Sequence, residues 1–148
     1  YKNLLLSCHS SEEDRAETKK TIRNKRDRRR LLHCDEFKED KELHYSPLEP
    51  DCSNHFSYKL NGEVKGDNQF AEADIDTLNL NCEKLVNRRR EQMLAYLFVD
   101  GAGADMLDYE SLKIFRDKIE ERDYDGNHYE FYFVIADVID NILTPISK

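Results

Sequence analysis

The C-terminal half of the chain carries a helical pattern of apolar residues. From about residue 78 onward, apolar side chains return every three or four positions, as on one face of an α-helix. Turn-forming stretches interrupt the pattern at 101–105 and 123–126, and Thr144-Pro145 ends it. Asn127 and Glu130 have the spacing of a capping box at the start of the third helix. The pattern predicts an antiparallel bundle of about three helices in residues 78–148 that holds most of the core.

A small β-hairpin is predicted near residues 56–65. Apolar and polar residues alternate from Phe56 onward, and Asn61-Gly62 is a preferred pair for a two-residue type I′ turn. Residues 35–55 mix charges with prolines and show no clear period. We therefore expect an irregular segment there, with the hairpin as a small appendage.

The N-terminal region is predicted to form one long, charged helix. Ser10 and Glu13 have the spacing of a capping box, and few apolar residues follow before His33. A helix this polar cannot bury much of itself in its own domain. The predicted organisation is a charged helical extension at 1–34, the irregular segment at 35–77 and a helical core at 78–148. The predicted fold class is mainly α, or α+β by content.

A second interpretation concerns residues 93–135. The stretches 94–100 and 129–135 are rich in aromatic and β-branched residues, so they also fit strands of a βαβ unit around a helix at 108–121. In that arrangement the sequence Phe98-Val-Asp100-Gly101 resembles the first strand of PIN-like nucleases. The resemblance implies that Asp100 would bind a divalent metal at a strand end. The further carboxylates that could join it are Asp105, Asp108 and Asp137.

Charge is distributed very unevenly along the 148 residues, whose net charge is −8. The first thirty residues contain ten Lys and Arg against five Asp and Glu, whereas the other 118 contain thirteen against twenty-six. Eight of the positive charges lie within residues 19–30, here called the basic segment. They are Lys19, Lys20, Arg23, Lys25, Arg26, Arg28, Arg29 and Arg30, and only Asp27 opposes them. Such asymmetry is typical of a surface for a polyanion or an acidic partner.

These charges lead to the functional hypothesis. The chain is expected to be a non-catalytic subunit or adaptor of a larger assembly, whose basic helix contacts structured RNA or an acidic protein. Arg88, Arg89 and Arg90 would extend the same surface. No motif places a nucleophile beside a base, so the sequence favours a non-enzymatic role. The alternative function is a metal-dependent nuclease or hydrolase that uses Asp100 and the nearby carboxylates.

Cysteine and histidine residues suggest one more site. Cys34, Cys52, His55 and His33 provide Cys and His ligands of the kind that zinc prefers, in two clusters separated by the irregular segment. Without zinc no cofactor is expected. The four cysteines of the chain are predicted to be free thiols in a reducing intracellular compartment. No apolar run approaches the roughly 20 residues of a membrane span.

Overall fold

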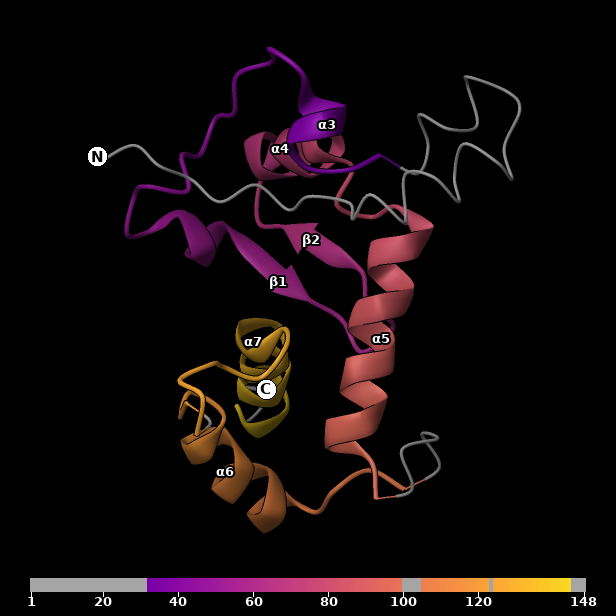
Figure 1. Cartoon of the computed structure of the whole chain (residues 1–148), viewed down its shortest axis with the longest axis vertical. Coiled ribbons are helices and arrows are strands. Elements are labelled where there is room, and N and C mark those ends of the chain that lie inside the picture. Colours follow the sequence, from indigo (N-terminus) through magenta and orange to yellow (C-terminus); the bar gives the residue numbers. More distant parts are fainter. Residues whose placement is uncertain (1–31, 100–104, 123, 145–148) are drawn as a thin grey trace. The chain divides into compact units, whose positions relative to one another are not determined.

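A computed structural model describes residues 32–99, 105–122 and 124–144 (Figure 1). The predicted N-terminal helix and the basic segment lie outside these residues, as does Asp100. In the described part, no helix combines the length and the apolar character needed to cross a bilayer. The elements in chain order are α3 (Asp35–Lys38), the short 3-10 helix η1 (Cys52–His55), β1 (Phe56–Tyr58), β2 (Val64–Gly66), α4 (Gln69–Leu78), α5 (Glu83–Leu97), α6 (Tyr109–Lys118) and α7 (Tyr132–Leu143).

The chain divides into two compact units. The described residues of the first unit are 32–56 and Val64–Leu85. Those of the second unit are Ser57–Glu63 and the described part of 86–144. Both the hairpin and α5 run from one unit into the other, so neither unit is one continuous stretch of sequence.

In the first unit, α4 packs against β2 and α3 (Figure 1). Ala71 and Ile75 lie one turn apart on α4 and are both buried, as is Val64 of β2. A Cβ atom on Gly66 would lie 2.7 Å from the Ala71 Cβ and 2.6 Å from the backbone nitrogen of Glu72. Glycine at this position therefore allows the strand to approach the helix closely.

The α4 helix corrects the prediction of an irregular segment at 35–77. The Asn68 side chain caps it by accepting hydrogen bonds from the backbone N–H groups of Phe70 (2.8 Å) and Ala71 (3.1 Å). At the other end, Asn79 adopts a left-handed conformation with φ 51°. The helix is short and rich in acidic residues, which hid its apolar stripe of Ala71, Ile75 and Leu78 in the sequence.

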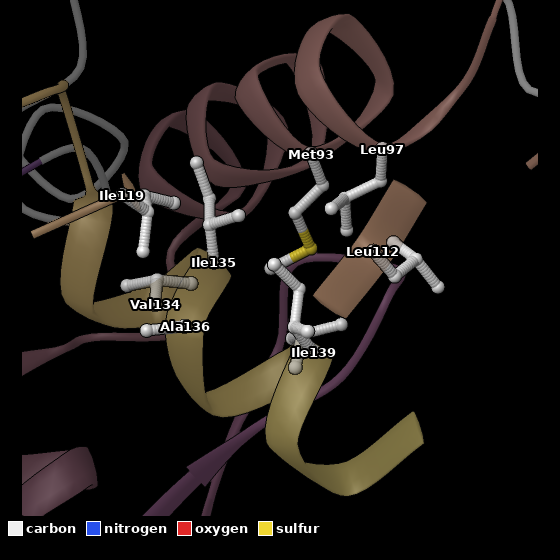
Figure 2. Close-up of a cluster of buried hydrophobic side chains, with 9 residues drawn as sticks. Met93, Leu97, Leu112, Ile119, Val134, Ile135, Ala136 and Ile139 are labelled. Carbon is white, nitrogen blue, oxygen red and sulfur yellow. The ribbon is translucent and has the colours of Figure 1, made fainter. Parts of the chain in front are cut away.

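The core of the second unit is built by α5, α6 and α7. Figure 2 shows Met93 and Leu97 of α5 with Leu112 of α6 and Ile135 and Ile139 of α7 in one buried cluster. These helices confirm the three helices predicted for this region. The alternative βαβ unit at 93–135 is wrong, because residues 93–97 and 132–135 are helical. Burial at positions 89, 93 and 97 follows the helical repeat, which is the physical reason the helix prevails.

The predicted start of α7 is also corrected. The helix begins at Tyr132, and its N-cap is Phe131, which has φ 56° and makes no side-chain cap hydrogen bond. The Asn127–Glu130 pair therefore lies before the helix and is not its capping box. By contrast, α6 has an ordinary cap, since the Asp108 side chain accepts a hydrogen bond from the Ser111 N–H at 2.8 Å.

The predicted hairpin is present, and its turn differs from the prediction. The β1 and β2 strands form a two-stranded sheet. The Gly62 N–H donates to the Lys59 carbonyl (2.8 Å), and the Lys59 N–H donates to the Glu63 carbonyl (2.9 Å). Gly62 has φ +89°, whereas Asn61 has no positive φ, which excludes a type I′ turn. The loop has three residues with a left-handed glycine, and the buried β2 makes the hairpin more than an appendage.

Candidate functional site

The three arginines expected to extend the basic surface have different roles in α5. Arg89 is only 4% exposed, and its Nε donates to the Gly62 carbonyl at 2.7 Å. Its guanidinium carbon also lies 5.9 Å from the centroid of the Tyr58 ring. Arg89 therefore holds the hairpin loop inside the second unit and contributes nothing to an exposed basic surface. Glycine at position 62 allows this approach, because a Cβ atom there would clash with the Val86 backbone carbonyl of α5.

Arg88 and Arg90 are both exposed. The Arg88 guanidinium forms an ion pair with Glu130, with 2.7 Å between Nη2 and Oε1. Gln92, one turn along α5, donates to the same carboxyl group at 3.4 Å. Of the three neighbouring arginines, one is thus buried and one is paired with a carboxylate of its own unit.

The candidate zinc ligands are not brought together. Within the described ranges, no group of three or more His, Cys, Asp and Glu side chains could hold a metal ion. Cys34 is disulfide-bonded, which takes away the thiolate that zinc would need. The ring Nδ1 of His33 lies 3.4 Å from the Cys34 sulfur, and His55 Nδ1 lies 3.0 Å from an Asp67 carboxylate oxygen. The expectation of free thiols holds for Cys52 and Cys82 and is wrong for Cys34.

Two carboxylates of the nuclease alternative, those of Asp108 and Asp137, serve the fold. Asp108 caps α6, as described above. Asp137 of α7 accepts a hydrogen bond from the Tyr58 N–H at 2.8 Å. Asp105 is exposed, and its backbone carbonyl accepts from Val99. With the strands of the βαβ unit replaced by helices, the geometric reason for placing Asp100 at a strand end is lost.

A buried carboxylate in the first unit was missed by the sequence interpretation. Asp74 is 1% exposed, and its two oxygens accept from the N–H groups of His44 (2.9 Å) and Tyr45 (2.9 Å). His44 Nδ1 lies 3.0 Å from the same carboxylate. Burial alone would raise the pKa of Asp74, but these hydrogen bonds outweigh it and lower the pKa below its usual range. Asp74 thus ties the segment before η1 to α4.

The His44–Asp74 pair has the geometry that orients an imidazole, but among the residues that the structure describes no activated nucleophile accompanies it. One candidate is the thiol of Cys52, whose pKa is raised by burial and by the carboxylates of Asp74 and Glu49. Because the reactive form of cysteine is the thiolate, a raised pKa makes this side chain a poor nucleophile. The pair is best explained as structural.

The second unit contains a cavity of about 320 Å³. Its lining comes from α5 and from the residues just before α7, and consists of Tyr96, Asn127, His128, Tyr129 and Glu130. The rings of Tyr96 and Tyr129 lie 5.5 Å apart at an interplanar angle of 74°. No sequence signal pointed to this site, because Tyr96 is 31 residues away from the nearest of the other lining residues.

Comparisons of the chain with protein-family models, with curated proteins and with solved structures found no match in any of the three.

Proposed function

We propose that this chain is a non-catalytic adaptor of a larger assembly that binds structured RNA through its basic segment, residues 19–30. The observation that carries the proposal is the charge pattern: eight positive charges and one negative charge in twelve residues, in a chain of net charge −8. Lys and Arg side chains bind phosphates mainly by displacing condensed counterions, which requires no base-specific pocket. Arginine at positions 26 and 28–30 suits bidentate contact with phosphate oxygens.

Several positively charged side chains in the described part of the chain already make contacts within the protein. They are less available to bind RNA, and this favours the basic segment as the binding element. Arg89 is buried on the hairpin loop, and Arg88 is paired with Glu130. Arg116 pairs with Asp140 (2.7 Å) and Glu120 (2.8 Å), and these hydrogen bonds raise its already high pKa. The acidic remainder of the chain repels a polyanion, which favours contact confined to residues 19–30.

A charge-matched pair of variants tests the proposal. One variant carries Arg26→Gln, Arg28→Gln, Arg29→Gln and Arg30→Gln. The control removes four positive charges from described positions by replacing Lys38, Lys41, Lys113 and Lys118 with Gln. Binding to an RNA hairpin is measured at several salt concentrations. We expect the arginine variant to lose at least tenfold in affinity and about one unit of salt slope per lost phosphate contact.

The outcomes separate the competing explanations. An equal loss in both variants would reduce the effect to net charge and contradict a specific basic segment. Unchanged binding in the arginine variant would also contradict the proposal. An acidic polypeptide that binds the unmodified chain where the RNA hairpin does not would identify an acidic protein partner instead of RNA.

A further inference from the structure

We infer that the cavity beside Tyr96 and Tyr129 binds an organic ammonium group, such as a dimethylated lysine side chain or a small free amine. This inference does not rest on the proposed RNA binding, since every lining residue lies in the second unit and none lies in the basic segment. The cavity volume of about 320 Å³ is at the lower end of the roughly 300–1,000 Å³ that small-molecule sites occupy. A small ligand or a single side chain is therefore the appropriate size.

Two aromatic rings form walls at nearly a right angle. The planes of the Tyr96 and Tyr129 rings meet at 74°. The centroid of the Phe115 ring lies 5.9 Å from that of Tyr96 and 6.3 Å from that of Tyr129. These contacts hold the Tyr96 ring in place, while Tyr129 stays 43% exposed and accessible from solvent. The electron-rich faces of such rings attract cations, which is how aromatic cages recognise ammonium groups.

The charged side chain in the lining is negative, which suits a positively charged ligand. Glu130 contributes a half-exposed carboxylate. His128 Nδ1 is buried and has no hydrogen-bond partner among the described residues. The His128 ring stacks on Tyr132 at 4.4 Å, which fixes its plane. Because this nitrogen is buried, a ligand in the cavity does not reach it, and the Glu130 carboxylate is the acceptor for an ammonium group. No Lys or Arg is among the lining residues, although the Arg88 guanidinium contacts the Glu130 carboxylate.

Arg88 acts as an internal competitor for the site. Its guanidinium already occupies the Glu130 carboxylate at 2.7 Å, which demonstrates that this carboxylate accepts an organic cation. Both side chains of the pair are about half exposed, and an exposed ion pair of this kind contributes little to stability. A ligand cation can therefore displace Arg88 at small cost. This predicts that removing Arg88 strengthens binding, the opposite of what an anionic ligand would show.

The first experiment separates charge from shape. The full chain is titrated by NMR with protonated N,N-dimethylethanolamine and, separately, with 3-methylbutan-1-ol, which has the same shape and no charge. We expect the resonances of Tyr129 and His128 to shift with the amine and not with the alcohol. Equal binding of the alcohol would overturn the inference. A peptide with dimethyl-lysine distinguishes the two sources of the group, according to whether it binds more tightly than the free amine.

The second experiment uses exposed residues, so the fold is retained. Glu130→Gln should weaken amine binding about fivefold, and Arg88→Gln should strengthen it about threefold. Arg90→Gln is the matched control, because it removes the same charge from an exposed neighbour and should leave the affinity unchanged. An equal effect of the two arginine substitutions, or no effect of Glu130→Gln, would overturn the inference. RNA binding by the basic segment is measured in parallel and should not change in Glu130→Gln.

Discussion

Each unit contains an aspartate that accepts a hydrogen bond from a distant backbone N–H, yet the two carboxyl groups are shifted in opposite directions. Asp74 in α4 binds the N–H groups of His44 and Tyr45, which lie about 30 residues earlier. Asp137 in α7 binds the N–H of Tyr58, 79 residues earlier. The pKa of Asp74 is lowered, whereas the pKa of Asp137 is raised. The ionised carboxylate is thus favoured by its surroundings at Asp74 and disfavoured by them at Asp137.

The difference comes from the surroundings of each carboxyl group. Burial disfavours the charged form in both cases. At Asp74, two backbone N–H groups and the His44 ring overcome that cost. At Asp137, burial is opposed by one backbone N–H and by the Asn141 amide at 3.2 Å, while the nearby carboxylate of Asp140 adds repulsion. The number of donors and the charge of the neighbouring groups together decide the direction of each pKa shift.

The largest change in stability is expected for the substitution Asp74→Asn. Both carboxylate oxygens accept hydrogen bonds, so an amide must turn its NH₂ group toward one of the backbone N–H donors. We expect the first unit to lose about 2 kcal/mol of stability at pH 7. Hydrogen exchange of the α4 amides measures this loss, because it reports on one unit at a time. Unchanged exchange in α4, or an equal increase in α7, would contradict the anchoring role of Asp74.

The two aspartates are also expected to make stability depend on pH in opposite ways. Because the folded-state pKa of Asp74 is lowered, its contribution is present above the unfolded-state pKa of about 3.9 and is lost as the pH falls through the folded-state value. Asp137 has a raised pKa, so its contribution is present below about pH 3.9 and is lost as the pH rises through its folded-state value.

Two pH profiles check this reasoning. The stability difference between the unmodified chain and Asp74→Asn should shrink from about 2 kcal/mol at pH 7 to a few tenths in strong acid. The profile for Asp137→Asn should change in the opposite direction between pH 4 and pH 7. Parallel profiles for the two variants would show that the opposite pKa shifts do not govern the acid response.

A smaller effect, of opposite sign, is expected for Asp137→Asn at pH 7. A single amide oxygen can accept from both the Tyr58 N–H and the Asn141 amide, since both now bind the same carboxylate oxygen, Oδ2. The substitution also removes the repulsion with Asp140. We expect the second unit to gain up to about 1 kcal/mol, measured by hydrogen exchange of the α7 amides. Asp137→Ala is the control, because it leaves the Tyr58 N–H without its acceptor and should destabilise the unit.

The contrast between these aspartates also shows what the sequence can reveal. The helices α5, α6 and α7 were predictable, because their buried residues repeat along a single helix, as Val134, Ile135, Val138 and Ile139 do. The helix α4 was missed because Asp74 occupies its buried face, where a charged residue breaks the apolar pattern. That residue is tolerated only because of donors from residues 44–45, a contact between distant positions that no local pattern records.

The candidate sites likewise depend on contacts between residues that are distant in the sequence. Runs of charge were visible in the sequence, but the buried state of Arg89 and the pairing of Arg88 with Glu130 depend on where a loop and a helix meet. The aromatic cavity joins Tyr96 to residues 127–130, which follow α6 in the sequence, so its chemistry appears only after the helices have packed. Local composition identified the basic segment, whereas the tertiary contacts decided which other charges remain accessible.

The smallest effect concerns the second donor to Asp137. Asn141→Ala removes the 3.2 Å hydrogen bond from the exposed Asn141 amide, and this raises the pKa of Asp137 further. Alanine also has a higher helix propensity than asparagine, so the two effects on stability oppose each other and the net change should stay within about 0.5 kcal/mol. The carboxyl pKa itself, followed by NMR, is therefore the decisive measurement.

Asp140→Asn provides the counterpart, because it removes the repulsion and should lower the pKa of Asp137. If both substitutions moved this pKa in the same direction, the balance of donors and neighbouring charge would not explain why the two aspartates differ.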